Sequence, residues 1–322
     1  MTETSKLPTP SPLRFWLTKF GPFLALAVVY VLFSGLRPET FLTWGNASIM
    51  LQQTVIIGIA ALGMTMVIIA GGIDLSVGSI IALCTIVVAR LLEMGWPPLA
   101  AGLAGVAAGA ACGAFSGLFI TRLRLLPFIV TLGTMGIWRG TAKGVAGEQP
   151  IYPDDTWLNN LMQLPPSGLP AGVWLLLGLS VVVAAVLRYT RFGRHVFAVG
   201  SNEATARLCG VRVERLKLWV FVLGSAFAGL AGVLQFSYLT GGDPTTAVGL
   251  ELNIIAAVVI GGASLSGGQG TIAGTLAGAL LMTVVANGCT KLELANWVQE
   301  IVTGAIIVAA VLLDRVRQKR GM

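Results

Sequence analysis

The sequence contains few charged residues, and this scarcity decides its broad class. Only 11% of the 322 residues are Asp, Glu, Lys or Arg, whereas a typical soluble domain has about a quarter. So few charges cannot cover the surface of a soluble protein of this length. The hydrophobic share of 55%, the mean hydropathy of +0.84 and the 41 glycines instead indicate a protein that lies in a membrane.

The residue types that build catalytic, metal and nucleotide sites are also scarce. His195 is the only histidine, and the four cysteines are scattered, so no cluster with metal-ligand spacing occurs. The chain has no Gly-x-x-x-x-Gly-Lys-[Ser/Thr] phosphate loop, no Ser/His/Asp set and no pair of buried carboxylates. We therefore expect no enzyme activity and no bound cofactor. The net charge of +7 resides in short loops without interleaved aromatics, so we expect no nucleic-acid partner.

Apolar runs recur along the whole chain. A membrane helix needs about 20 mostly apolar residues, and reading for such runs predicts an all-α, multi-pass membrane bundle with about ten transmembrane helices. Two runs fit the pattern least, because 126–142 contains Arg139 and 250–263 is short. The predicted spans are 20–36, 52–70, 76–93, 97–120, 126–142, 171–188, 217–237, 250–263, 271–289 and 297–313.

The positions of Lys and Arg predict the orientation. With the N-terminus in the cytoplasm, the inner segments hold 16 of the 21 basic residues. By the positive-inside rule, both termini are therefore expected in the cytoplasm. The predicted organisation is a tail at 1–19, one transmembrane domain at 20–313 and a basic tail at 314–322, with a cytoplasmic loop at 188–217 and an irregular outer loop at 143–170.

The cytoplasmic loop contains a motif that predicts a short helix. Ser201 or Asn202 can act as its N-cap, because a side-chain oxygen can accept a bond from a free backbone N–H. Glu203 suits the first turn, and Arg207, four residues later, suits an ion pair with it. Gly210 can adopt the left-handed conformation that ends a helix.

So short a helix is unstable on its own in water and must dock on something. One possibility is another subunit. The other is the lipid headgroups of the membrane surface, where Arg191 and Arg194 would anchor it. Local features alone do not separate these two hypotheses.

Two glycine pairs interrupt apolar runs. The segments 71–78 and 261–268 both fit Gly-Gly-x-x-Leu-Ser-x-Gly and predict broken or short helices. Irregular backbone at membrane depth is tolerated only where protein or a water-filled cavity covers it. Asp74 lies in the first break and is either an intramembrane functional acid or, as we favour, a cap for a helix that starts at Leu75 near the interface.

Polar residues near span ends and breaks are candidates for lining a translocation path. They are equally good candidates for hydrogen bonds between helices. The candidate set is Gln52, Gln53, Thr54, Gly71, Gly72, Asp74, Ser76, Asp243 and Asn253.

The stretch from Gly63 to Ser79 resembles the signature of ribose-type monosaccharide ABC transporter permeases, the membrane subunits of bacterial sugar importers. Further matches follow in the same order, and together they cover nearly the whole chain. They are 126–133, 190–194 with 200–211, and 251–262 with Ser264, Leu265, Gly267 and Gly268. The family usually has Glu-Leu-Asp where this chain has Glu251-Leu252-Asn253, and serine where it has Cys209.

The resemblance implies a machine in the bacterial inner membrane. Two permease chains would form the path, a cytoplasmic ABC ATPase would hydrolyse ATP, and a periplasmic sugar-binding protein would deliver the solute. The loop at 143–170 would then be periplasmic. The helix in the cytoplasmic loop would couple to the ATPase through Ser201, Asn202, Glu203, Ala204, Thr205, Arg207, Leu208 and Gly210. The asparagine at 253 puts in doubt any substrate role carried over to that position.

Other functions remain open at this point. An ion-gradient-driven secondary transporter would use Asp74 and Asp243 as coupling sites and would need no ATPase. A passive channel would need no energy source. Within the resembled family the solute could also be a nucleoside, an amino acid or a signalling sugar.

Overall fold

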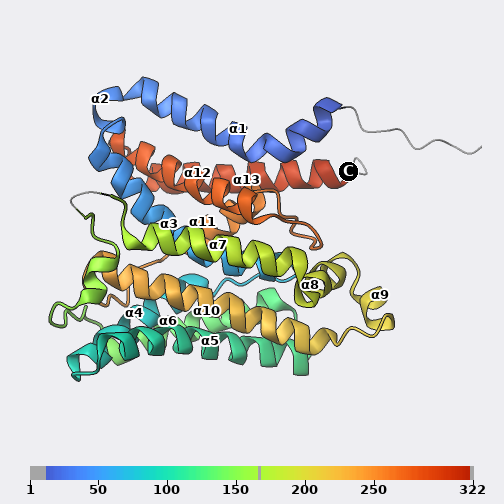
Figure 1. Ribbon diagram of the computed structural model, residues 1–322, viewed down its shortest axis with the longest axis horizontal. Coiled ribbons are helices and arrows are strands. Elements are labelled where there is room, and N and C mark those ends of the chain that lie inside the picture. The colour runs from blue at the N-terminus through green and yellow to red at the C-terminus, as the bar shows by residue number, and fades with distance from the viewer. Residues whose placement is uncertain (1–11, 166–167, 320–322) are drawn as a thin grey trace, which may run out of the picture.

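A computed structural model of the protein describes residues 12–165 and 168–319, with side chains for 20–165, 168–312, 314 and 315. Every regular element in these ranges is a helix, and the one β-bridge is an isolated pair between Ile151 and Gly242. Figure 1 shows the long helices packed side by side along one common direction. The chain is therefore an all-α bundle.

The elements occur in chain order with short connections. They are α1 (Pro12–Leu36), α2 (Pro38–Phe41), α3 (Trp44–Ile69), α4 (Val77–Glu93), α5 (Pro98–Arg122), α6 (Pro127–Ala146), η1 (Trp157–Leu161), α7 (Ala171–Tyr189), α8 (Arg191–Ser201), α9 (Glu203–Leu208), α10 (Val213–Leu239), α11 (Leu250–Ile260), α12 (Ile272–Lys291) and α13 (Asn296–Lys319).

Each of the ten predicted apolar segments contains a helix in the structure. Among the described residues, five helices are long and apolar enough to cross a membrane, namely α3, α5, α7, α10 and α12. The chain is therefore a multi-pass membrane protein. The remaining apolar helices include α11, which has only 11 residues because the second glycine pair follows it directly.

Helix α3 forms the centre of the bundle. In its most apolar window 89% of the residues are buried, so protein rather than lipid surrounds it. It packs against α7, α10, α11 and α12. Helices α5 and α10 approach closely because small residues face each other: a Cβ on Gly109 would lie 2.7 Å from the Cα of Gly229. Such small-residue contacts are typical of membrane helix packing.

Several boundaries differ from the sequence prediction. The predicted cytoplasmic loop contains an additional helix, α8, and the predicted irregular outer loop contains the end of α6 and the short helix η1. Helix α1 begins at Pro12, inside the predicted N-terminal tail, and α13 continues to Lys319, inside the predicted C-terminal tail. Residues 1–11 and 320–322 of those tails lie outside the described part of the chain.

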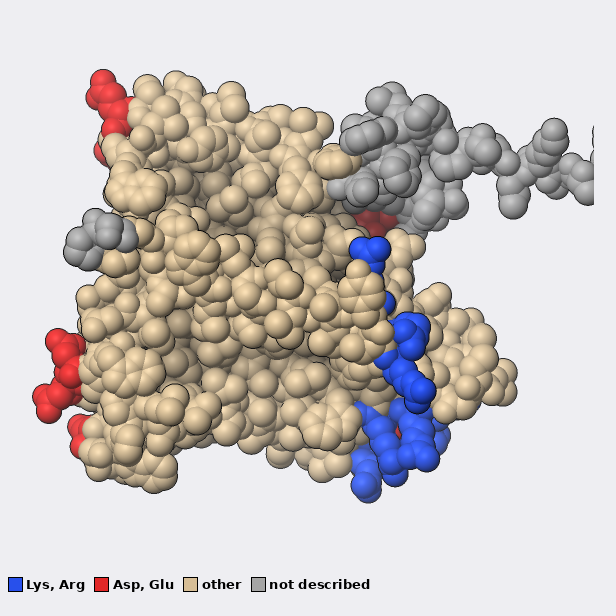
Figure 2. Space-filling model, in the orientation of Figure 1, with Lys and Arg blue, Asp and Glu red and all other residues tan. Residues whose placement is uncertain are grey.

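The two ends of the bundle carry opposite charge. Figure 2 shows Lys and Arg side chains gathered at the end that carries α8 and α9, while acidic side chains stand out at the opposite end. The start of α1 and the end of α13 lie at the same end as α8 and α9 (Figure 1). We call this the basic end of the bundle, and the other the acidic end.

Candidate functional site

Helix α9 projects from the basic end of the bundle (Figure 1). Its N-cap is Asn202, whose Oδ1 accepts a hydrogen bond from the backbone N–H of Thr205 at 2.9 Å. Ser201, the other N-cap candidate, is instead the last residue of α8. Helix α9 ends as its sequence predicts, because Gly210 has φ +81° and the N–H of Val211 donates to the carbonyl of Ala206 at 3.1 Å.

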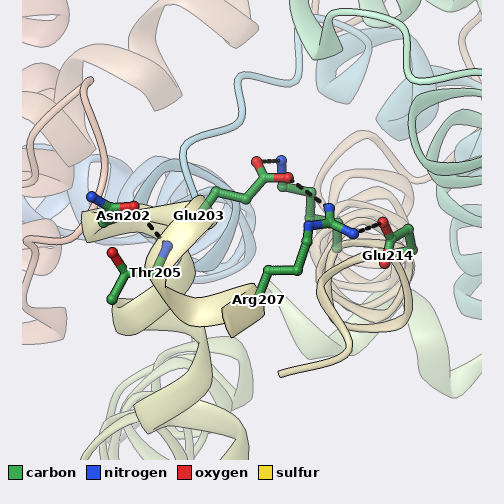
Figure 3. A network of polar contacts seen from close by, with 6 residues as sticks. Asn202, Glu203, Thr205, Arg207 and Glu214 are labelled. Atoms are coloured by element: carbon green, nitrogen blue, oxygen red, sulfur yellow. Dashed lines mark hydrogen bonds and ion pairs between the residues drawn. The ribbon is translucent and has the colours of Figure 1, made fainter. Parts of the chain in front are cut away.

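An ion-pair network holds α9 against the start of α10. The Glu203 carboxylate lies between two cations, the Lys217 ammonium at 2.6 Å and the Arg207 guanidinium at 3.2 Å. Figure 3 shows Glu203 and Arg207 pointing toward each other, with Glu214 on the other side of the guanidinium. Arg207 also donates to Glu214. The hydrogen bond from Lys217 and the nearby positive charges lower the pKa of Glu203 below its ordinary value. The predicted ion pair between Glu203 and Arg207 is confirmed. Lys217 and Glu214, which were not part of that prediction, extend the pair to a network.

The outward face of α9 is exposed, and the helix is held to the described chain by this network and by its packing against α8 and α10. Ala206 alone in the helix is buried, whereas Ala204 is exposed and Leu208 is 89% exposed. Residues four positions apart lie on one helix face, so Ala204 and Leu208 form an apolar strip beside the charges. Beside α9, the turn between α5 and α6 completes a pocket of about 510 Å³ whose lining includes Arg124 and Leu126. This combination is suited to receive a protein surface.

A second groove at the basic end lies between α8 and the start of α10. It has a volume of about 360 Å³, and its lining includes His195, Arg212, Arg215 and Trp219. Trp219 is 59% exposed and lies one turn beyond Arg215 on α10. An exposed tryptophan next to arginines is typical of a membrane interface.

Two of the three path candidates near the start of α3, Gln52 and Thr54, have intramolecular hydrogen-bond partners. Gln52 donates through Nε2 to the carbonyl of Met162, and Thr54 donates to the carbonyl of Met50 at 2.7 Å. Gln53, between them, is partly buried. Gln52 thus links α3 to the residue that follows η1, whereas the Thr54 hydroxyl bonds to the backbone of its own helix.

Asp74 lies in the segment between α3 and α4 and is 4% exposed. Its Oδ1 accepts from the backbone N–H of Ser76 at 2.8 Å and from the Ser76 hydroxyl at 2.6 Å, while Ser225 of α10 donates to Oδ2 at 3.4 Å. The predicted helix start at Leu75 is wrong by two residues, since α4 begins at Val77. Asp74 therefore organises the turn that precedes α4 rather than capping a helix directly.

The glycines of the first break have the conformation and burial that a tight turn requires. Gly71 has φ +79°, and the neighbouring Gly72 is buried. Helix α3 ends just before them, at Ile69.

Asp243 and Asn253 lie toward the acidic end. Asp243 accepts the N–H and hydroxyl of Thr245, both at 2.7 Å, and thus stabilises its own turn. Asn253 of α11 lines a groove of about 470 Å³ together with side chains of α13, and its buried Oδ1 has no hydrogen-bond partner among the described residues. The α13 side chains that line this groove are Asn296, Gln299, Glu300 and Thr303.

The path candidates do not form one site. Gln52 and Ile69 are separated by 17 residues of continuous α3 helix, which corresponds to about 25 Å, so the glutamines and the first glycine break lie far apart.

Sequence reasoning missed the polar side chains of α13, because α13 was identified only as an apolar span. The presence of Asn296, Gln299, Glu300 and Thr303 on consecutive turns of that helix was the available signal.

Comparison with known proteins identifies what the chain is similar to. Residues 46–311 match the family described as branched-chain amino acid transport system / permease component. The ribose import permease protein RbsC of Escherichia coli K12 is 38% identical over 95% of this chain and 96% of its own length. RbsC of Bacillus subtilis 168 is 39% identical over 93% of each chain. The D-allose transport system permease protein AlsC of E. coli K12 is 35% identical over 95% of this chain and 94% of its own. No solved structure matches the chain.

Proposed function

Because the chain belongs to the family described as branched-chain amino acid transport system / permease component, we propose that it forms the transmembrane path of an ATP-driven monosaccharide importer. The names of its relatives support a sugar: proteins 35–39% identical over nearly the whole chain are ribose and D-allose permeases. The chain itself would hydrolyse no ATP and carry no cofactor. A separate ABC ATPase at the basic end would supply the energy.

The observation that carries this proposal is the geometry of α9. A six-residue helix is too short to be stable alone, yet here it is capped by Asn202 and braced by Glu203, Arg207 and Lys217. A brace of this kind keeps the helix in place while its apolar strip stays exposed. Leu208, at 89% exposure, would be the side chain that enters a groove of the ATPase.

The remaining parts of the proposal follow from the two ends of the bundle. The basic end would face the cytoplasm with both termini, by the positive-inside rule. All ten apolar helices would then cross the membrane, with short or broken helices at the two glycine pairs. The acidic end would face the periplasm and receive a sugar-binding protein, and a second permease chain would complete the path. The groove beside Arg212 and Trp219 would hold phospholipid headgroups.

The test is reconstitution of the permease with an ABC ATPase and a periplasmic sugar-binding protein. We expect Leu208→Asp to abolish ATPase association and uptake, because a charge on the strip cannot enter an apolar groove without a partner. Leu164→Asp, an exposed leucine in the outer loop, is the matched control and should leave ATPase association intact. Solute uptake driven by an ion gradient, without any ATPase, would instead establish a secondary transporter.

The accessibility of a native cysteine tests the proposed membrane orientation. Cys209, directly after α9, is exposed, whereas the other three cysteines are buried. A membrane-impermeant maleimide should modify Cys209 only from the cytoplasmic side, and bound ATPase should slow the reaction. Modification from the periplasmic side would invert the proposed topology.

A further inference from the structure

Three segments that are distant in the sequence meet in backbone contact beside α9. They are the end of α3 at Ile69 to Gly71, the end of α8 at Gly200-Ser201, and Gly267-Gly268 between α11 and α12. The N–H of Gly268 donates to the carbonyl of Ile69 at 2.8 Å. We call this contact the glycine junction. Both glycine breaks of the sequence contribute to it.

At Gly200, Gly267 and Gly268 the glycine junction has no room for a side chain. A Cβ on Gly200 would lie 1.7 Å from the carbonyl oxygen of Ile69 and 2.6 Å from the nitrogen of Gly268. A Cβ on Gly267 would lie 2.7 Å from the Gly200 oxygen and 3.1 Å from the Cα of Gly71. Gly267 and Gly268 also have φ +87° and +75°, which favour glycine. Because the three backbones touch directly, no flexible side chain can absorb a movement of one segment relative to the others.

The junction is linked to α9 by the shortest possible connection. Ser201 ends α8, and Asn202, the N-cap of α9, donates its N–H to the carbonyl of Ala198 within α8 at 3.0 Å. Displacement of α9 therefore moves the end of α8. Gly200 touches Ile69 and Gly268 at once, so the same movement reaches two segments.

The two segments that Gly200 touches, at Ile69 and at Gly268, connect directly to long helices of the bundle. Ile69 ends the central helix α3, and the first break continues into α4 at Val77. Gly268 precedes α12, which is capped by Thr271, and Thr65 of α3 shares a 2.8 Å hydrogen bond with Thr275 of α12. The junction thus lies at the end of α3 and in the segments that connect α3 to α4 and α11 to α12. Close-packed interiors transmit displacement instead of absorbing it.

We infer that Gly200 and Gly268 are positioning residues for transport, through which movement of α8–α9 reaches α3–α4 and α11–α12 at the same time. This inference rests on the proposed coupling of α9 to an ATPase. It assigns the two glycine breaks a role in coupling to ATP hydrolysis, in place of the solute-lining role that their membrane location had indicated. Loss of the junction should therefore separate ATP hydrolysis from transport without altering ATPase binding.

The first experiment uses Gly200→Ala in the reconstituted complex. We expect the ATPase to remain bound and active, while the amount of solute transported per ATP hydrolysed falls at least tenfold. The matched control is Gly178→Ala in α7, where a Cβ meets nothing within 4 Å. An unchanged ratio of solute to ATP in the Gly200 variant would overturn the inference.

A second experiment decides the matter even where Gly200→Ala fails to assemble. It leaves every junction residue unchanged: Gln269, which is exposed and directly follows Gly268, is replaced in Gln269→Cys and spin-labelled together with the native Cys209 after α9. Because the inference has α9 and the Gly267-Gly268 segment move together, the distance between the two labels should stay unchanged when the complex binds and hydrolyses ATP. A clear change in that distance during ATP hydrolysis would refute the inference.

The outcome is distinguishable from failure of the proposed function. If the unsubstituted chain binds no ATPase, the proposed function is wrong, and the inference about the junction, which rests on it, fails as well. If the unsubstituted chain couples ATP hydrolysis to uptake and Gly200→Ala does so equally well, only the junction inference fails.

Discussion

Asn46 of α3 and Asn287 of α12 exchange two hydrogen bonds of 2.9 Å inside the bundle, although 241 residues separate them in the sequence. Both side chains are buried, at 2% and 7% exposure. The Asn46 amide also donates to the carbonyl of Phe41 at 3.0 Å. This reciprocal pair fixes the central helix to its neighbour on the acidic side of the Thr65–Thr275 contact.

Removal of one member of this pair should destabilise the protein. Asn287→Ala leaves the Oδ1 of Asn46 without its donor in a dry interior, which we expect to cost about 1–2 kcal/mol of unfolding free energy. Unfolding in mixed detergent micelles measures the change. Thr290→Ala, an exposed site on the same helix, is the control and should change stability by less than about 0.5 kcal/mol. A double Asn46→Ala, Asn287→Ala variant more stable than the single one would confirm the penalty of the orphaned amide.

Acid should loosen the attachment of α9, whereas a change between neutral and mildly alkaline pH should not. The lowered pKa of Glu203 means that its ion pairs stabilise α9 above the carboxyl group's ordinary pKa, near 4.5. That stabilisation is lost as the pH falls through the lowered value. A spin label on Cys209 should therefore show constant mobility between about pH 8 and pH 5 and greater mobility in stronger acid. In the Glu203→Gln variant the label on Cys209 should have high mobility over the whole pH range. Label mobility that does not change with pH in the native chain would contradict this account.

High salt should weaken the same network. Glu203 and Arg207 have side chains 44% and 49% exposed, so water and ions reach the pair. We expect spin-label mobility at Cys209 to rise between about 0.1 M and 1 M salt, over which the screening length shrinks from about 10 Å to 3 Å. The Glu203→Gln variant provides the comparison, because it has no carboxylate charge to screen at that position. Mobility that is equally insensitive to salt in both chains would show that the Asn202 cap alone holds α9.

The groove beside Asn253 should affect transport more than stability. Because Asn253 Oδ1 is buried without a partner among the described residues, truncating it removes no hydrogen bond of the folded chain. If the solute supplies that partner, Asn253→Ala should reduce uptake about three- to tenfold, which corresponds to one hydrogen bond. Asn160→Ala, an exposed amide of η1, is the matched control. Uptake by Asn253→Ala equal to that of the control would remove Asn253 from the path.

Much of the local structure could be predicted because its causes are local. The cap at Asn202, the Glu203–Arg207 pair and the left-handed Gly210 depend on residues within a few positions of each other, and the structure confirms all three. Helix α8 was missed because its pattern is amphipathic and its basic residues were assigned to a loop. The start of α4 differs from the prediction because Asp74 bonds to Ser76, the residue directly before the helix, and not to the helix itself.

The sequence by itself determined that this chain is a multi-pass helical membrane protein with one basic end, because hydropathy and charge act through the solvent at each position. Only the tertiary structure decided which residues meet. Asn46 with Asn287, and Gly200 with Ile69 and Gly268, are joined by packing between helices that are far apart in the chain. Glycine in a sequence shows that backbone can approach closely there, but which backbone approaches is decided by the packing of the whole bundle.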